Sequence, residues 1–411
     1  MMIHVLGLVT AVLAGSAPSR QAALVPEAEL AQLTAGNTDF AMALFSELTA
    51  EKADGNLFFS PFSITTALAM TYAGAEGETA RQMAHTLHFT LPEGRLHRAF
   101  SEALRRLDPA FREELIYEEF EPLTLEIANA LWVERTYRLL DDYTEIVESS
   151  YGARAANVDF SRDPEGSRAA INDWVADRTR DRITDLLPPG IIDTLTRVVL
   201  TNAVYFKGAW GHQFEETFTR DEDFTTLSGE TVSVPMMHQT ERLEYCHACG
   251  CTAVRLPYSD WASSMLILLP DGDLSGFEQS LDREALEEIT GSLAGREVAL
   301  SMPRFEFTSS FSLADVLKRM GMTDAFGSDA DFSGMTGVRD LYISAVIHKA
   351  FVKVDETGTE AAAATAVVMA LGCAMSEPPV EIRFDRPFVF VLMDDLTGSI
   401  LFMGRVADPR G

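Results

Sequence analysis

One stretch of this chain carries no charged side chain over sixteen consecutive residues, and it constrains the fold more than any other feature. It runs from Ala361 to Ser376, reads AAAATAVVMALGCAMS, and is bounded by Glu360 and Glu377. The run is too short and too rich in alanine for a membrane span, which needs about 20 apolar residues. Alanine favours helices, so a buried helix is one interpretation. The other is an exposed loop whose composition allows it to become a strand.

The chain as a whole is strongly acidic. Its 411 residues include 33 Lys+Arg and 62 Asp+Glu, which gives a net charge of −29. Such a chain repels phosphate backbones and anionic membrane surfaces, and this argues against a nucleic-acid partner. With 47% hydrophobic and 23% charged residues, the composition is typical of a globular protein.

The amino terminus contains a second uncharged run. Residues 3–14 (IHVLGLVTAVLA) have no charged side chain when His4 is neutral, and the small residues Gly15-Ser16-Ala17 follow. The length and the small-x-small pattern are typical of a signal peptide and not of a membrane span. We therefore predict a signal peptide at 1–17, an N-terminal extension at 18–34, and a secreted, periplasmic or extracellular protein. Positive residues are nearly missing before the run, so an apolar tail or a mis-assigned start codon is the alternative.

Helical patterns dominate the first third of the chain, and strand patterns dominate the rest. Helices are predicted at 37–49, from Ser60-Pro61 onward, and at 165–180. Strands are predicted at 196–206, 263–269, 297–307 and 388–393. Helical runs followed by strands favour an α+β fold, and the lack of a linker favours a single domain. No further apolar segment is long enough for a clear membrane span, so we expect the mature protein to be soluble. We also expect a monomer.

Three of the four cysteines lie close together in the sequence, at Cys246, Cys249 and Cys251, with His247 between them. They could offer soft ligands to zinc, but ligands on so short a segment cannot easily close a tetrahedron. The alternative is the tip of a hairpin between two strands, and we expect no metal site. The chain also lacks HExxH, GxSxG, a glycine-rich phosphate loop and paired CxxC motifs. We therefore expect no catalytic residue and no cofactor, and a metal-dependent enzyme built on this cluster is the opposing hypothesis.

Several segments resemble one known family in order and spacing. The segment 355–366 (DETGTEAAAATA) resembles the reactive-loop hinge of serpins, and 56–64 resembles their shutter segment. Further serpin-like segments occur at 201–210, 234–237, 330–335, 344–350 and 386–390. The resemblance implies one serpin domain at 35–411 with three β-sheets, about eight or nine helices, and an exposed reactive-centre loop at about 356–380.

The hinge has the composition that strand insertion requires. The resemblance assigns it to Glu356, Gly358, Thr359, Glu360, Ala361, Ala362, Ala363, Ala364 and Thr365. Alternate side chains of a strand face opposite sides, so small residues at 359, 361, 363 and 365 can pack inward while Glu360 points outward. No proline lies between Gly358 and Glu377, so every backbone N–H there can join a ladder.

The resemblance also implies structural roles for residues elsewhere. Ser60, Ser63, Asn202 and His348 match the polar shutter positions, where the sheet opens, and Trp210 matches the breach, where insertion begins. A satisfied polar cluster and a plain core tryptophan are the simpler interpretations of the same residues.

The implied activity is suicide inhibition of a protease. The protease would cleave the loop, form an acyl-enzyme, and be trapped when the loop inserts into the central sheet before deacylation. A non-inhibitory serpin, acting as a binding module, is the alternative, although the small hinge residues argue against it.

Counting along the loop from Thr359 places the reactive bond at Gly372-Cys373, with Leu371, Met375 and Ser376 as neighbouring candidates. No Arg or Lys lies in 357–382, which argues against a trypsin-like target. The small and apolar residues of the loop favour an elastase-, subtilisin- or chymotrypsin-like serine protease, with a papain-like cysteine protease next.

Overall fold

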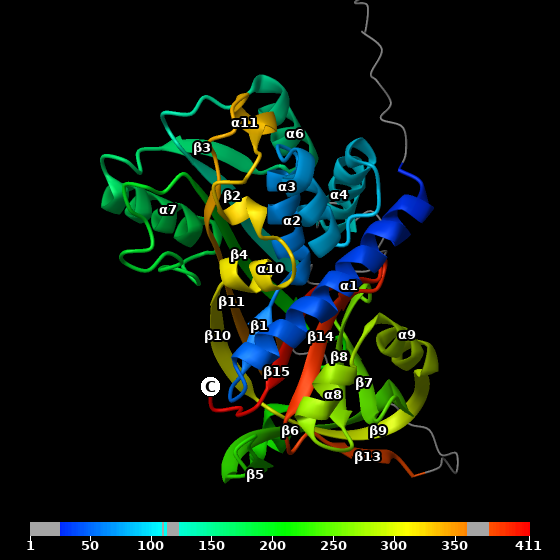
Figure 1. The fold of residues 1–411 in the computed structure, drawn as a ribbon. Coiled ribbons are helices and arrows are strands. Elements are labelled where there is room, and N and C mark those ends of the chain that lie inside the picture. The colour runs from blue at the N-terminus through cyan, green and yellow to red at the C-terminus, as the bar shows by residue number, and fades with distance from the viewer. Residues whose placement is uncertain (1–24, 109–110, 113–122, 360–377) are drawn as a thin grey trace, which may run out of the picture.

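The computed structural model describes residues 25–108, 111–112, 123–359 and 378–411. It confirms the predicted α+β fold: the strands of the described residues form two hydrogen-bonded sheets, with helices packed around them (Figure 1). Ten α-helices lie in these residues, where about eight or nine were expected.

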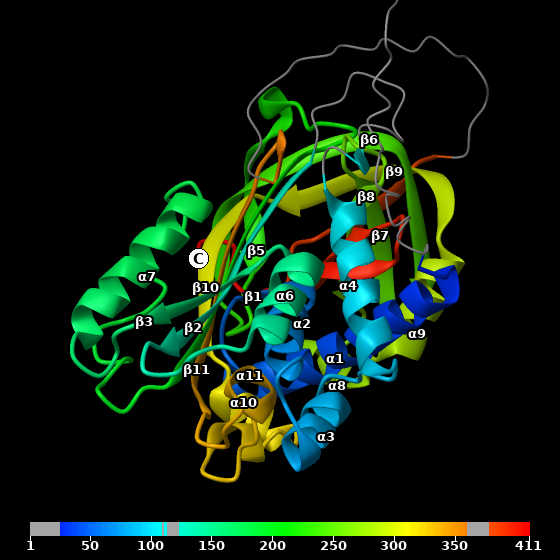
Figure 2. The same cartoon turned by 90° about the horizontal axis from the view of Figure 1, so that it is seen from above.

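The six-stranded sheet contains part of the predicted hinge and part of the predicted shutter. Its order is β10 (Phe305–Ser312), β11 (Ile343–Val354), β12 (Gly358–Thr359), β4 (Val198–Ala209), β2 (Thr124–Glu134) and β3 (Arg154–Val158). β11 and β4 run parallel and pair directly from Ile343 and Val198 up to Ala350 and Val204. Beyond that point the two-residue strand β12 lies between them. Helix α7 (Pro164–Arg178) covers one face of the sheet, where Ile171 and Val175 join a small apolar core (Figure 2).

The second sheet has nine strands, so the described residues form two hydrogen-bonded sheets where the resemblance implied three. Its strands are β1 (Leu57–Phe59), β15 (Ser399–Val406), β14 (Phe388–Asp394), β8 (Ser263–Pro270), β7 (Cys251–Pro257), β6 (Thr231–Ala248), β9 (Ala294–Pro303) and β13 (Val380–Arg383), with β5 (Arg220–Thr225) paired to β6. The 18 residues of β6 pair with β5 at one end and with β7 at the other. This long strand therefore holds β5, β7 and β9 in one hydrogen-bonded sheet.

Helix α2 (Pro61–Tyr72) lies in the middle of the molecule and contacts β2, β4 and β15 (Figures 1 and 2). Ser60 caps it by accepting from Ser63 N at 3.2 Å, and Pro61 occupies its first turn, as predicted. The other helices are α1 (Glu27–Glu51), α3 (Gly77–Thr86), α4 (Glu93–Leu107), α6 (Asp141–Tyr151), α8 (Leu274–Ser280), α9 (Arg283–Ser292), α10 (Ala314–Arg319) and α11 (Ser333–Thr336).

Two boundaries differ from expectation. The single strand predicted at 297–307 is two strands, because β9 ends at Pro303 and the chain crosses at Arg304 into β10 of the other sheet. Helix α1 begins at Glu27, before the expected domain start at 35, and it buries Leu30 and Leu33. Among the described residues, no helix combines the length and apolar character needed to cross a membrane. The expected signal peptide at 1–17 lies outside the described residues.

Candidate functional site

Two residues of the expected hinge already occupy a place in the six-stranded sheet. After β11 ends, the chain turns tightly, and Asp355 N donates to Gly358 O at 3.0 Å. Gly358 and Thr359 then pair with Ala209 and Gly208 at the end of β4, while Thr359 also pairs with the end of β11. β12 is thus the first pair of residues of a strand between β11 and β4.

Gly358 lies where the backbone of β4 comes closest. A Cβ at this position would lie 2.1 Å from Gly208 O and 2.8 Å from Ala209 Cα, which is closer than side chains approach backbone atoms. Any larger residue would push β12 away from β4. Besides the freedom it provides at the turn, this glycine is needed for the close approach of two strands.

The other predicted loop residues cannot be placed. The hinge residues Glu360, Ala361, Ala362, Ala363, Ala364 and Thr365, and the reactive-bond candidates Leu371, Gly372, Cys373, Met375 and Ser376, lie outside the described residues.

Trp210 connects the hinge turn to the nine-stranded sheet. Its backbone N–H donates to Thr357 O at 3.0 Å, and its indole Nε1 donates to Asp355 O at 2.9 Å. Its ring stacks on Tyr258, with centroids 4.9 Å apart and an interplanar angle of 11°. The Tyr258 hydroxyl lies 2.8 Å from Thr359 Oγ1, and burial raises the pKa of this phenol above its usual range. The hydroxyl therefore stays protonated and can hydrogen-bond to the hinge.

We call Trp210, Tyr258 and Thr359 the breach cluster. The Thr359 side chain is buried, but its hydroxyl contacts Tyr258 and not a helix beneath the sheet, where the sequence led us to expect it. Sequence reasoning missed Tyr258, which belongs to no motif and simply follows β7. Only the tertiary structure brings it to the hinge.

Glu356 anchors the start of the hinge. Its carboxylate is buried, accepts from Arg304 Nε at 2.6 Å, and also accepts from the Thr219 hydroxyl. Its backbone O accepts from Phe214 N at 2.9 Å. A buried carboxylate needs such partners because desolvation disfavours its charge. These contacts hold the beginning of the hinge against the segment that follows β4.

The four predicted shutter residues lie together in one buried polar network. His348 of β11 and Asn202 of β4 are directly opposite each other in the sheet, and His348 Nδ1 bonds to Asn202 Oδ1. Asn202 Nδ2 donates to Ser63 Oγ at 2.6 Å, and the Ser60 hydroxyl donates to Leu401 O at 2.6 Å. The network therefore spans β11, β4, the start of α2 and β15.

Asn129 of β2 is a further member that sequence reasoning missed. Its Oδ1 accepts from Asn202 Nδ2, and its own Nδ2 donates to Ser63 O at 3.1 Å. Asparagine at a strand position carries no special sequence signal, so only the pairing of β2 with β4 reveals it. We call Ser60, Ser63, Asn129, Asn202 and His348 the shutter cluster; the opening role of its members stays a prediction.

His348 is neutral in this environment. Burial lowers the pKa of its imidazole to about 3, and its Nε2 accepts from Ser60 N at 3.2 Å. Because Nε2 is the acceptor, the network assigns the proton to Nδ1, which donates to Asn202. This side-chain hydrogen bond adds to the backbone pairing of β11 and β4, the two strands between which a new strand would enter.

Comparison with known proteins decides the family. Residues 35–409 match the family model described as Serpin (serine protease inhibitor). The chain belongs to the serpin family. It is 41% identical to the leukocyte elastase inhibitor of Bos taurus over 92% of this chain and 100% of that protein. Among solved structures, it is similar to Serpin48 of the insect Tenebrio molitor, with a TM-score of 0.81 and 31% identity over 92% of this chain and 98% of that one. It is also similar to human thyroxine-binding globulin in complex with thyroxine, with a TM-score of 0.83 and 30% identity over 93% and 100% of the two chains.

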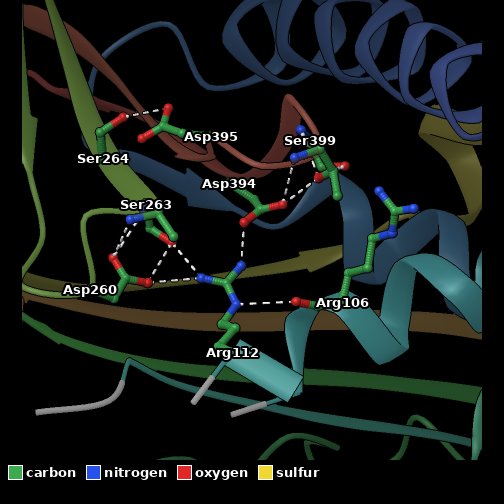
Figure 3. A network of polar contacts seen from close by, with 10 residues as sticks. Arg106, Arg112, Asp260, Ser263, Ser264, Asp394, Asp395 and Ser399 are labelled. Carbon is green, nitrogen blue, oxygen red and sulfur yellow. Dashed lines mark hydrogen bonds and ion pairs between the residues drawn. The ribbon is translucent and has the colours of Figure 1, made fainter. Parts of the chain in front are cut away.

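A second buried network in this serpin is built from charges (Figure 3). Arg112, which follows α4, donates to Asp260 Oδ2 at 2.8 Å, to Ser263 Oγ at 2.9 Å, and to Asp394 Oδ1. Burial raises the pKa of the Asp394 carboxyl, while the Arg112 charge opposes that shift. We call Arg112, Asp260 and Asp394 the arginine cluster. Sequence reasoning missed it because Arg112 is one of many arginines.

The cysteines form the predicted hairpin tip. Cys246 and Cys251 lie on neighbouring strands at the β6–β7 turn, and the Cys246 and Cys249 thiols contact the backbone oxygens of Ile289 and Ala285 in α9. Within the described residues all three are free thiols, and burial raises the pKa of Cys251 to about 12. No set of three or more His, Cys, Asp and Glu in the described part of this serpin is arranged to hold a metal ion. Cys373 lies outside that part.

Proposed function

We propose that this serpin is a suicide-substrate inhibitor of serine proteases. The observation that carries the proposal is the position of β12, which starts a strand between β11 and β4 while these strands remain paired below it. A loop cut beyond Thr359 could continue that strand by parting the two neighbours. The small residues at 361, 363 and 365 of the sequence meet the packing requirement for doing so.

The chemistry belongs to the protease. Its serine hydroxyl attacks the carbonyl carbon of the reactive bond, the amine of the next residue leaves, and an ester joins protease and inhibitor. From Gly358 to Gly372 is 15 residues, which extends over ~50 Å as a strand. Insertion of this length would carry the ester-linked protease toward the opposite end of β4 and distort its active site before water hydrolyses the ester.

We propose Gly372-Cys373 as the reactive bond and an elastase-, subtilisin- or chymotrypsin-like enzyme as the target, with a papain-like cysteine protease as second choice. The absence of Arg and Lys from 357–382 supports this choice. The names of relatives in cattle and pig, both leukocyte elastase inhibitors, also support it. We further propose export through the signal at 1–17, which N-terminal sequencing of protein recovered from the medium tests.

The test is complex formation. The purified chain is incubated with leukocyte elastase, chymotrypsin, subtilisin and papain, and the products are separated in SDS. We expect a covalent complex and a released peptide of 39 residues, since 411 − 372 = 39. The variant Thr359→Arg should be cleaved without forming the complex, because a charged side chain cannot replace Thr359 against Tyr258.

Cleavage of the unaltered chain without a complex, for every protease, would contradict inhibition. It would favour a binding role, which the similarity to thyroxine-binding globulin makes the second candidate. Melting curves of intact and cleaved protein separate the two: an inserting loop raises the melting temperature after cleavage, and a non-inserting loop leaves it unchanged.

A further inference from the structure

Four neighbouring strands lie at one end of the molecule: β5 pairs with β6, β6 with β9, and β9 with β13 (Figure 1). β13 is the outermost of the four. It has four residues and, among the residues that the structure describes, pairs with β9 alone. In the sequence, β13 is the first strand after residues 360–377.

Besides its backbone pairing, β13 is held by an ion pair to a strand beyond its neighbour. Arg383 of β13 donates to Glu222 Oε2 of β5, and it also pairs through its backbone with Ser301 of β9. The other carboxylate oxygen, Glu222 Oε1, accepts from Arg220 Nε at 2.5 Å. We call the ion pair between Glu222 and Arg383 the β13 clamp.

His238 of β6 lies directly against this clamp. Its Nδ1 is 3.0 Å from Ser301 Oγ, and its Nε2 is 3.1 Å from Glu222 Oε1. In spite of that short distance, Nε2 is buried and makes no hydrogen bond within the described part of the chain. The distance is suitable, so the alignment of the two groups is what prevents a bond. A proton on both ring nitrogens would turn this unpaired contact into an attraction between a cation and the carboxylate.

The charges around His238 make the folded arrangement a poor proton acceptor. Burial lowers the pKa of its imidazole below the usual range, the Glu222 carboxylate opposes that shift, and the charges of Arg220 and Arg383 add to it. Although burial opposes it, hydrogen bonds from both arginines hold the pKa of Glu222 below its usual range, so Glu222 stays charged in mild acid. Other carboxylates close to the cluster are Asp385, beside Arg383, and Glu215 and Glu241, which line a cavity together with His238. Since a free imidazole has a pKa of about 6.5, acid below that value favours an arrangement in which the crowding of cations is relieved.

We propose that the β13 clamp is acid-sensitive and that protonation of His238 releases it. The imidazolium takes its second proton from solvent and bonds to Glu222 through Nε2. To align with it, the carboxylate turns, and Oε2 leaves Arg383. The outer strand then keeps only its four-residue pairing with β9 and opens more often.

The consequence for inhibition rests on the proposed function. Because β13 follows the predicted reactive loop in the sequence, a loose β13 loosens the attachment of that loop, and we expect inhibitory activity to be lost in mild acid. The clamp itself can be tested without a protease.

The experiment measures the hydrogen-exchange protection of the amides of residues 380–383 at about pH 7.5 and about pH 5, on either side of the pKa of a free imidazole, after correction for the pH dependence of exchange itself. His238→Gln keeps a polar group beside Ser301 and cannot take up a proton. Arg383→Gln removes the cation of the clamp. His212→Gln is the matched control, because His212 is half-exposed and its nearest carboxylate is Glu241, at 4.0 Å.

In the unaltered chain, we expect protection of β13 to be about fivefold lower, or less, at the acid pH, because release is linked to uptake of one proton. His238→Gln should show equal protection at both pH values, and His212→Gln should behave like the unaltered chain. Arg383→Gln should show low protection at both, since it has no clamp to lose. Inhibition of leukocyte elastase, measured after incubation in acid, should be lost faster in the unaltered chain than in His238→Gln.

Equal protection of β13 at both pH values in the unaltered chain would overturn the acid-sensitive clamp, and so would a pH dependence that persists in His238→Gln. Full protection of Arg383→Gln at neutral pH would show that the ion pair does not hold β13, and the inference would fail. A chain that forms no complex with any protease would overturn the proposed inhibition alone, because the exchange measurement uses no protease.

Discussion

The shutter cluster and the arginine cluster are both buried and polar, but they are built from different groups. The shutter cluster contains neutral hydroxyl, amide and imidazole groups, and its bond from His348 to Asn202 crosses between β11 and β4. The arginine cluster sets one guanidinium against two carboxylates and connects Arg112, which follows α4, to the start of β8 and to β14 (Figure 3). β8 and β14 pair with each other along most of their length.

The difference in the groups that build the two clusters agrees with their different positions relative to the proposed opening of the sheet. A neutral side-chain hydrogen bond contributes a net ~0.5–1.5 kcal/mol, so the bond from His348 to Asn202 adds only a modest cost to parting β11 and β4. Breaking a buried ion pair leaves an uncompensated charge and costs about 3–5 kcal/mol. In this serpin, the neutral shutter cluster lies where the proposed mechanism opens the sheet, and the charged arginine cluster lies outside that opening, against β8 and β14.

The largest expected effect concerns the arginine cluster. Arg112→Met leaves the carboxylates of Asp260 and Asp394 buried without their cation, so we expect the free energy of unfolding to fall by about 3–5 kcal/mol. Denaturant unfolding measures it. Arg319→Met is the control: Arg319 is exposed and pairs with Glu47 and Glu51, so its loss should stay within about 1 kcal/mol. Equal losses would show that burial of the charges does not matter.

The second prediction uses the buried histidine of the shutter cluster. Because burial lowers the pKa of His348 to about 3, the unfolded chain binds a proton below pH ~6.5 that the folded chain does not. Stability is therefore complete above that pH and falls by about 1.4 kcal/mol per pH unit as the pH drops toward 3. His348→Gln should reduce this slope when melting is followed between pH 7 and 4.5.

His97 provides the matched control, since burial lowers its pKa to about 4 and it lies outside the shutter cluster. His97→Gln should reduce the slope in the same way while leaving the yield of protease complex unchanged. If His348→Gln and His97→Gln affect inhibition alike, the shutter cluster has no special role in opening the sheet.

The third prediction concerns the shutter at neutral pH. His348→Ala removes the bond to Asn202 and the acceptor of Ser60 N, so we expect a loss of about 1–3 kcal/mol. The sheet should then open more readily, and polymers or a spontaneously inserted form should accumulate on native gels after mild heating. Unchanged melting together with unchanged inhibition would refute the shutter role.

The smallest expected effect is at the breach cluster. Tyr258→Phe removes the hydrogen bond to Thr359 and keeps the ring stacked on Trp210, so stability should fall by about 1 kcal/mol. The hinge loses an anchor, and more inhibitor should be cleaved per complex formed. Tyr143→Phe removes another buried hydroxyl bond, to Met70 O, and should cost similar stability without changing that number.

Several helices and strands could be predicted from short segments of the sequence. Helix α2 was predicted from Ser60 and Pro61, and β4, β8 and β14 from their apolar runs, because caps and hydrophobic patterns act over a few residues. The crossing at Arg304 was missed, since a continuous strand pattern does not show where a chain changes sheets. Most of the proposed site was named by family resemblance, but Asn129, Tyr258 and Arg112 were not.

The sequence by itself determined the α+β class, the hinge composition and the absence of charge from residues 361–376, because these depend on residue type and order. Only the tertiary structure decided which groups meet: His348 with Asn202, Thr359 with Tyr258, and Arg112 with Asp394. The last pair is 282 residues apart in the chain. Contacts over such distances arise from strand pairing and helix packing, and no local pattern encodes them.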